Sequence, residues 1–387
     1  MVLRHFWGAR KWGVPGSGYA DLPHHHALAE VKSERLYEIG GEPPQSTWGD
    51  VGGLHKTLDG HVRIHDSFPH QRLGTLRLLE LPLEASRDDV ASETKLWRSI
   101  DLETSGIERG LAIYALRTYD EGDAHPQVSL TISPEVLIRI DASGPCLRVV
   151  EFSRVIAAPV ADKTLAAHGA DALWVTSPPH LPGLPPLDRE FGRGKRTIQL
   201  DIGDPSDKAR LLERLRTADA FIQGYRPGSL AAHGLSPAEL AAANPGLVVA
   251  NLSAFGPDGP WSGRRGFDPL VQTCSGMNLW TTALGYFLAS GISAALHKRA
   301  TEGGSWIADA SLAGVMKYPR SLGQYAGKTG FEAHDITNNL PENLFQRRET
   351  DFGMTKYLKH SATVEGHEPG WDVMPKISGT DEPRWLS

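Results

Sequence analysis

The chain has 387 residues, which is more than one average hydrophobic core, so we expect roughly two or three structural units. It carries 40 Lys and Arg against 46 Asp and Glu, and this formal net charge of −6 disfavours a nucleic-acid-binding protein. Hydrophobic residues make up 40% of the chain, so it can bury a core. Two cysteines cannot form a disulfide framework, and no uninterrupted apolar run is long enough for a membrane span. We therefore expect a soluble protein whose partners are neither nucleic acids nor membranes.

The amino-terminal part is predicted to contain an irregular tail followed by a small α+β domain. Residues 1–47 have many turn formers and no sustained periodicity. Within residues 48–128, two extended runs meet at Asp59-Gly60, which is typical of a hairpin because glycine adopts positive φ easily. Helices are expected at 71–81, 86–100 and 107–119, and a linker at 129–146.

The pattern changes at residue 147, where buried strands begin to alternate with helices. Strands are expected at 147–152, 172–175, 197–200, 220–223 and 247–252, with helices at 158–169, 207–217, 229–233 and 237–243. This alternation predicts an α/β fold, in which a Rossmann-like, mostly parallel sheet over 147–316 follows the small α+β domain. Ligands of such sheets bind beyond the carboxyl ends of the strands. Residues 317–387 are expected to form an irregular extension that wraps the core or is partly disordered.

Positively charged side chains lie beside several of these strands. The first strand ends in Ser153-Arg154 rather than in the Gly-x-Gly-x-x-Gly pattern of a dinucleotide site, so NAD and FAD are disfavoured. Further cations lie in 193–196, before the third strand, and at Arg226, after the fourth. Cations on separate loops around one crevice suit a polyphosphate, although a solvated cluster would have the same pattern. We expect Arg154, Lys195 and Arg226 to converge at one rim of the sheet.

A series of motifs is more specific than these cations alone. In chain order they are Val149–Pro159, Leu165–Asp171, Gly192–Asp201, Gly224–Leu230, Asn244–Val248, Phe255–Pro260 and Gly266–Asp268. By their order and spacing, residues 147–313 resemble the class III CoA-transferases, a CaiB/BaiF-like family that includes formyl-CoA transferase-, carnitine CoA-transferase- and α-methylacyl-CoA racemase-like enzymes. The unit at 48–128 is similar to the family's small domain. That domain follows the nucleotide-binding half in the family and precedes it here, so this chain resembles a fused or rearranged member.

The resemblance implies acyl transfer by a CoA-binding domain. Coenzyme A or acyl-CoA would be a substrate rather than a permanently bound cofactor, a small carboxylic acid would be the second substrate, and no metal is implied. A family aspartate attacks the acyl-CoA carbonyl, forms a mixed anhydride and releases the CoA thiolate, which then re-adds to the second acid. The implied pantetheine contacts are Ser153, Arg154, Val155 and Ile156, and the implied nucleotide contacts are Lys195, Arg196, Gly224, Tyr225 and Arg226.

Two departures from the family leave the activity open. Phe267 stands where the racemase branch has a proton-moving histidine, which disfavours isomerisation. The family's nucleophilic aspartate is missing, because the segment that ends in it is shortened to the connection at 278–282. Asp268 is the nearest remaining acid and the catalytic candidate, with a loop-fixing carboxylate as the alternative. Three functions therefore remain: a CoA-transferase, active or impaired; a racemase-like isomerase; and an inactive CoA-binding or interaction protein.

The family also implies an assembly. Its subunits interlock as dimers, so the resemblance implies a homodimer, or a pseudo-dimer made by the fused halves. The low cysteine content favours a reducing compartment, and we expect a cytoplasmic protein. The chain does not end in a peroxisomal Ser-Lys-Leu signal, yet the sequence leaves both the peroxisome and the mitochondrion open.

Overall fold

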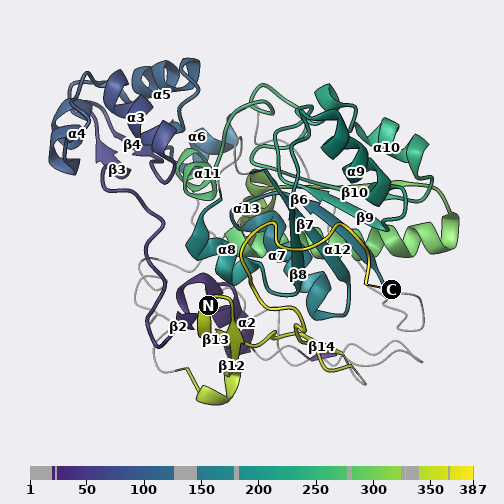
Figure 1. The fold of residues 1–387 in the computed structure, drawn as a ribbon. Helices are drawn as coiled ribbons and strands as arrows, with labels where there is room; N and C mark the ends of the chain where they lie inside the picture. Colours follow the sequence, from purple (N-terminus) through teal and green to yellow (C-terminus); the bar gives the residue numbers. More distant parts are fainter. Residues whose placement is uncertain are drawn as a thin grey trace.

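A computed structural model of the chain describes residues 20–21, 24–125, 146–177, 183–276, 281–323, 327, 340–364 and 367–386. These residues form a large α/β unit, a small α+β unit, and two terminal segments that pair with each other (Figure 1). Among the residues so described, no helix has both the length and the apolar character needed to cross a membrane.

Six strands form the sheet of the large unit, in the order β11-β10-β9-β6-β7-β8. Their bounds are β6 Arg148–Phe152, β7 Asp171–Thr176, β8 Lys195–Gln199, β9 Ala220–Gln223, β10 Val248–Ser253 and β11 Trp306–Ser311. All neighbours are parallel. The five predicted strands are confirmed, because each is an apolar run that the sheet buries on both faces. The structure adds β11, which we did not predict.

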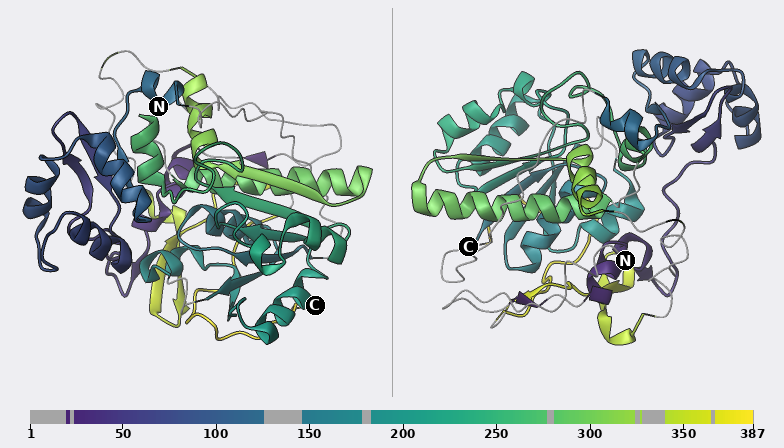
Figure 2. Two further views of the ribbon diagram at one scale, coloured as in Figure 1. Left: turned by 90° about the horizontal axis from the view of Figure 1, so that it is seen from above. Right: turned by 180° about the vertical axis from the view of Figure 1, so that it is seen from behind.

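Helices cover both faces of this sheet. On one face lie α7 (Ala157–Ala167) and α12 (Thr281–Glu302), with α11 (Asp268–Ser275) and α13 (Leu312–Ser321) beside them (Figure 2). On the other face lie α9 (Pro205–Leu215) and α10 (Pro237–Ala243). The alternation of strand side chains separates the two cores: Val149 of β6 belongs to the first and Val150 to the second.

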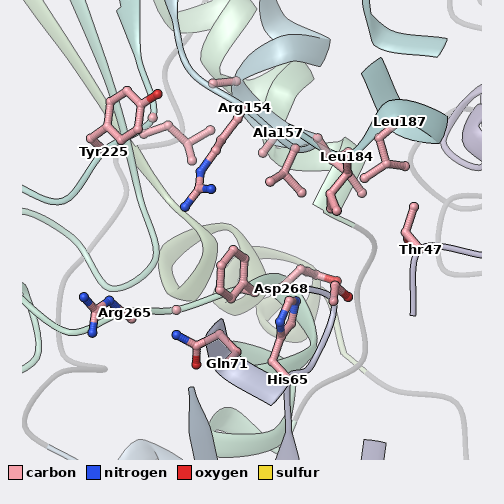
Figure 3. Close-up of a pocket in the computed structure, with 18 of the residues that line it drawn as sticks. Thr47, His65, Gln71, Arg154, Ala157, Leu184, Leu187, Tyr225, Arg265 and Asp268 are labelled. Carbon is pink, nitrogen blue, oxygen red and sulfur yellow. The ribbon is translucent and has the colours of Figure 1, made fainter. Parts of the chain in front are cut away.

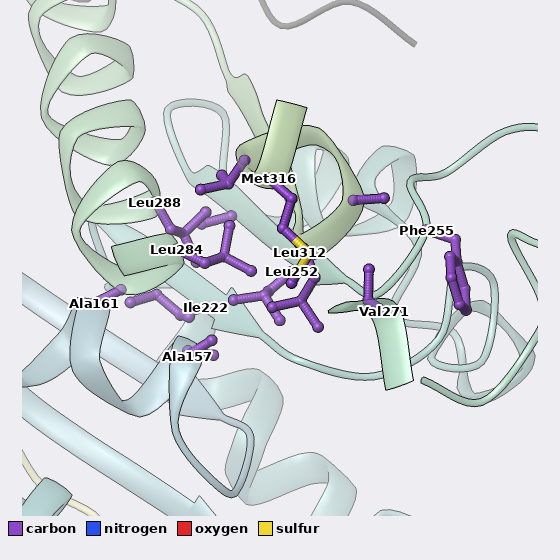
Figure 4. Packing of buried hydrophobic residues seen from close by; sticks show 14 of the residues in the cluster. Ala157, Ala161, Ile222, Leu252, Phe255, Val271, Leu284, Leu288, Leu312 and Met316 are labelled. Carbon is purple, nitrogen blue, oxygen red and sulfur yellow. The ribbon is translucent and has the colours of Figure 1, made fainter. Parts of the chain in front are cut away.

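Helices α7 and α12 approach each other closely. Leu284 and Leu288 of α12 pack toward Ala157 and Ala161 of α7 (Figure 4). Between the two leucines, Gly285 lies against α7, where an added Cβ would be 2.5 Å from the carbonyl oxygen of Ala157. Small residues therefore allow the two backbones to come together at the start of α7.

The small unit is a three-stranded antiparallel sheet with helices packed on it. It contains β3 (Gly53–Lys56), β4 (His61–Ile64), β5 (Ile113–Ala115), α3 (Pro69–Leu78), α4 (Arg87–Thr94) and α5 (Ser99–Glu108). The predicted hairpin is confirmed, with Lys56 opposite His61. The helix predicted at 107–119 is wrong: α5 ends at Glu108, and β5 follows because its three residues are buried against β4.

The small unit is fixed to the large unit through β5 and α11. The Tyr114 hydroxyl of β5 donates to the backbone oxygen of Arg265 at 2.6 Å, and the Arg117 N–H donates to the backbone oxygen of Thr273 at 3.1 Å. The Tyr114 ring also belongs to the core that α7 and α12 share. These contacts hold the small unit beside the carboxyl ends of the parallel strands. The short helix α6 (Tyr119–Asp123) follows this junction.

The two terminal segments are more ordered than we expected. Residues 1–47 were expected to be irregular, but α2 (His24–Glu30), the 3-10 turn η1 (Ser33–Arg35) and β2 (Glu38–Ile39) lie within them. The extension from 317 was also expected to be irregular, yet it contains β12 (Phe345–Thr350), β13 (Gly353–Leu358) and β14 (Thr363–Val364). Strand β2 pairs with β13, and β1 (Ala20–Asp21) pairs with β14. Long-range pairing of this kind has no local sequence pattern.

The described part of the carboxyl-terminal segment wraps the large unit, which is one of the two alternatives expected for it. The Asp381 carboxylate accepts from the Thr197 N–H at 2.8 Å, so the segment covers the β8 edge of the sheet. The Trp371 indole donates to the backbone oxygen of Lys163 in α7 at 2.9 Å. Arg193, which is buried beside α8 (Pro185–Phe191), donates to the backbone oxygen of Leu358 at 2.8 Å.

Substitution of the α12 glycine tests the close approach of α7 and α12. We expect Gly285→Ala to lower the unfolding free energy by about 1–3 kcal/mol, because its Cβ would overlap Ala157 and Val160. Gly291→Ala is the matched control in the same helix: its Cβ would meet only Ala308 at 3.5 Å, so it should be neutral or stabilising by up to about 1 kcal/mol. Chemical denaturation measures the unfolding free energy of both variants, and equal values would contradict the close packing of Gly285 on α7.

Candidate functional site

A cavity of about 1020 Å³ lies between the small unit and the carboxyl ends of the parallel strands (Figure 3). Its walls come from the β6–α7 turn, the loops after β8 and β9, the small unit with the segment that leads into it, and the loop before α11. Small-molecule sites usually occupy about 300–1,000 Å³, so this cavity is large enough for an extended ligand.

The β6–α7 turn forms the strained wall of the cavity. Val155 has φ = 77°, a conformation that a β-branched residue rarely adopts. Such strain costs about 1–3 kcal/mol and persists only where surrounding contacts hold it. Ile156 then precedes α7 without a side-chain cap, and Ala157 and Ala158 at the helix start line the cavity. The amide groups of this helix start suit a negatively charged ligand.

Four arginines line this cavity: Arg35 of η1, and three that reach it from separate loops. The Arg154 guanidinium points into it, 4.7 Å from the centre of the Phe68 ring (Figure 3). Burial lowers the pKa of Arg154, yet a guanidinium stays protonated in proteins. Arg226 lies on the loop after β9 and donates to the backbone oxygen of Gly263 at 3.3 Å. Arg265 donates to the backbone oxygen of Gly110 at 2.6 Å. The cavity is thus lined by cations from both sides.

The loop after β9 packs directly on the β6–α7 turn. A Cβ on Gly224 would lie 3.1 Å from the Cβ of Ser153 and 3.4 Å from that of Ala158, so a larger side chain would push the two loops apart. The Tyr225 N–H donates to the Gln223 side chain at 2.8 Å, which fixes the start of this loop. Burial raises the pKa of Tyr225, so its hydroxyl stays protonated.

An imidazole and a phenyl ring stack on the opposite side of the cavity. His65 and Phe267 lie 4.1 Å apart between ring centres at an interplanar angle of 17°. Burial, followed by the charges of Arg63 and Arg154, lowers the pKa of His65 to about 3. His65 is therefore neutral at neutral pH and is a poor proton acceptor, and Phe267 carries no proton at all.

Asp268 is the first residue of α11 and lines the cavity beside this stack (Figure 3). The Gln272 side chain donates to its Oδ2 at 2.5 Å. Asp268 also lies close enough to Arg63 for their charges to interact. The carboxylate therefore has a fixed orientation on the cavity wall.

The prediction that cations converge at one rim of the sheet is wrong for the loop before β8. Six of the nine predicted CoA contacts line the cavity, namely Arg154, Val155, Ile156, Gly224, Tyr225 and Arg226, whereas Ser153, Lys195 and Arg196 do not. The reason is the register of the sheet: Lys195 and Arg196 begin β8 opposite Ala172 and Leu173, near the amino end of β7. Lys195 pairs with Glu151 and Arg196 with Asp171, both at 2.6 Å, and all four side chains are buried.

Several cavity residues were missed by the sequence reasoning. Thr47 and Trp48, in the segment that leads into the small unit, have no motif around them. Arg265 directly precedes the Gly266–Asp268 motif. His65 directly follows β4, and alternation along 61–65 would place it on the face of His61, so this pattern could have identified it. The shortened connection at 278–282 falls largely outside the described residues.

The chain belongs to CoA-transferase family III, whose family model matches residues 146–347. An acyl-CoA transferase of Gibberella moniliformis is 26% identical over 329 residues, which are 79% of this chain and 55% of that protein. The probable fatty acyl-CoA transferase Rv3272 of Mycobacterium tuberculosis is 31% identical over 223 residues, which are 50% of this chain and 55% of that protein. The chain thus spans about half the length of these curated relatives.

Solved structures are similar over part of the chain. The crystal structure of Rv3272 from Mycobacterium tuberculosis is 26% identical, with a TM-score of 0.43, and the match covers 48% of this chain and 58% of that one. A CaiB/BaiF family protein from Brucella suis is 25% identical, with a TM-score of 0.40, over 54% of this chain and 64% of that one.

The lowered pKa of His65 predicts a loss of stability in acid. Because the unfolded chain takes up a proton near pH 6.5 and the folded chain does so only near pH 3, the unfolding free energy should fall as the pH drops below 6.5. Between pH 7 and pH 5 we expect the wild type to lose about 2 kcal/mol more than His65→Phe, which keeps the stack. Denaturant titrations at both pH values measure this, and parallel losses would show that His65 titrates normally.

Proposed function

We propose that this chain binds an acyl-CoA thioester in the cavity and exchanges its CoA with a small carboxylic acid. The observation that carries the proposal is the convergence of Arg154, Arg226 and Arg265 on one cavity at the carboxyl ends of a parallel sheet. Membership of CoA-transferase family III supports CoA as the ligand. Because the chain spans about half of its relatives' length, the activity is inferred for this chain and not transferred from them.

The nucleotide part of CoA suits the side of the cavity near β9. Arg226 supplies a guanidinium for phosphate oxygens, and Tyr225 supplies a protonated hydroxyl that interacts with the charge of Arg154. The pantetheine arm would then run along residues 154–156 past the start of α7, both of which line the cavity. In this orientation the thioester would reach the wall that carries His65 and Asp268.

Asp268 is the proposed nucleophile. Its carboxylate oxygen would attack the thioester carbonyl carbon; a C–O bond forms, the C–S bond breaks, and the CoA thiolate leaves with the electron pair. The thiolate would then attack the Asp268 carbonyl carbon of this anhydride and release the first acid as a carboxylate. The acceptor carboxylate would displace CoA from the resulting Asp268 thioester, and the thiolate would attack the acceptor carbonyl of the new anhydride, which frees Asp268. The bond from Gln272 and the charge of Arg63 support a carboxylate that is oriented and lies near a positive charge. The segment in which the family carries its own aspartate lies largely outside the described residues.

Isomerisation is the less suitable reaction for this site. It needs a group that removes a proton from the α-carbon and another that returns it. Phe267 has no ionisable group, and the imidazole stacked on it has a pKa of about 3, so it is a very weak base. These two rings favour transfer over isomerisation.

Assembly and compartment follow from the same proposal. The cavity lies between two units of a single chain, which supports a pseudo-dimer in which the fused order replaces a partner subunit.

Both cysteines are free, which agrees with a reducing compartment such as the cytoplasm.

Calorimetric titration of CoA tests the ligand. Arg226→Ala should weaken CoA binding about 10- to 100-fold, because it removes a charged hydrogen bond to phosphate, and it should reduce the dependence of affinity on salt. Arg216→Ala removes an exposed arginine outside the cavity and should bind CoA as the wild type does. Equal affinities of the two variants would contradict the position proposed for the phosphates.

Exchange of labelled CoA between an acyl-CoA and a free carboxylic acid tests the reaction. Asp268→Asn should lower the exchange rate at least about 1,000-fold, since an amide is a poor nucleophile, while CoA affinity stays within about threefold. An Asp268→Asn variant with undiminished exchange would assign the nucleophile to another residue. A wild type that binds CoA without exchange would instead be an inactive CoA-binding protein.

A further inference from the structure

A buried ion pair lies under the β6–α7 turn and outside the cavity. The Lys195 ammonium donates to Glu151 Oε2 at 2.6 Å and to the backbone oxygen of Pro159 at 2.7 Å. Both charged side chains are 0% exposed. Lys195 begins β8 and Glu151 precedes the last residue of β6, so the lysine side chain crosses the intervening strand β7 to reach both the glutamate and α7.

This pair is connected to the turn through Ser153. The Ser153 hydroxyl donates to the Glu151 carboxylate, and the Trp174 indole donates to the Ser153 backbone oxygen at 3.1 Å. Gly224 packs against the Ser153 side chain from the β9 side. Ser153 is therefore held by β6, β7 and the β9 loop, and the next residue along the chain is Arg154.

A second buried acid does not compete for the lysine. Asp162 of α7 lies 4.0 Å from the Lys195 ammonium. Burial raises the pKa of Asp162 well above its usual value, which favours its uncharged form. Glu151, at 2.6 Å, is the acid in direct contact with Lys195. The lysine and the glutamate therefore balance each other, and loss of either would leave a charge buried alone.

The location of this pair gives it more than a packing role. A single unpaired charge in such a place is strongly unfavourable, whereas a neutral pair of similar volume is often tolerated. The strained φ of Val155 persists only while its surroundings are rigid. An unpaired charge under Ser153 would draw water in and allow the turn to relax.

We propose that Lys195 and Glu151 are positioning residues, which hold the turn at 153–156 in the shape that receives the ligand. This inference rests on the proposed function, because the ligand at the turn is taken to be CoA. The two residues touch no ligand: the pair acts through Ser153 on Arg154 and on the start of α7. Lys195 is thus assigned to the support of the site and not to the phosphates.

A series of charge-removing substitutions distinguishes support of the turn from direct contact with the phosphates. Lys195→Met leaves the Glu151 carboxylate buried without its positively charged partner. The double variant Glu151→Gln with Lys195→Met removes both charges and keeps an amide that can bond to Ser153. The exposed pair Lys298 and Glu302, whose atoms are 3.5 Å apart, supplies the matched control with the same two substitutions. Calorimetry measures CoA affinity, and hydrogen exchange followed by mass spectrometry measures protection of the peptide that covers 152–158.

The expected result is a paired loss and rescue. Lys195→Met should weaken CoA binding about tenfold or more and should speed exchange at 152–158, and the double variant should restore both. The control variants should change neither. A double variant that regains protection but still binds CoA tenfold more weakly would show that Lys195 contacts the ligand, and would overturn the proposal. Normal protection in Lys195→Met would overturn it as well.

Two further arms keep the test decisive. If Lys195→Met does not fold, Ser153→Ala removes the hydroxyl between the pair and the turn, and unchanged exchange in that variant would overturn the proposal. If the wild type does not bind CoA, the proposed function fails. Hydrogen exchange then still decides whether the pair holds the turn, because this measurement needs no ligand.

Discussion

Exclusion of water from the space beneath α7 is the constraint on which the large unit depends. The ammonium of Lys195 and the carboxylate of Glu151 can remain there only because they meet each other, a backbone carbonyl and a serine hydroxyl. Gly285 of α12 packs against Ala157 and Val160 of α7, and the Trp174 ring of β7 lies 5.3 Å from the Lys195 ammonium. The strained turn above the pair is rigid for the same reason.

The cavity depends on a second requirement, which is the attachment of the small unit. Tyr114 carries its ring into the core of the large unit and its hydroxyl to the backbone of Arg265. One residue thus fixes the junction and also positions an arginine of the cavity wall. In proteins whose small domain comes from a partner chain, such a junction would be an interface; here it is made within one chain. The chain therefore contains both walls of its cavity although it spans about half of its relatives' length.

The sequence predicted local structure well and predicted the arrangement of charges only in part. Strands such as Val248–Ser253 could be recognised because apolar runs between turn formers are local patterns. Arg154 and Arg226 were placed correctly at the carboxyl ends, since each follows its strand directly. Lys195 was misplaced because it begins a strand, and only the register of β7 with β8 shows which end of the sheet it occupies. The helix predicted at 107–119 failed because burial, and not propensity, decides a three-residue strand.

The pairing of β2 with β13 has a consequence for the order in which the chain is assembled. Ile39 is opposite Thr355, so more than three hundred residues separate the two sides of one small sheet. During synthesis the parallel sheet has all six strands by Ser311, but the amino-terminal segment must wait, unpaired, until the ribosome has released β13. For that interval the edge of β2 that later pairs with β13 has no partner strand, and slow translation near the carboxyl end would lengthen the interval.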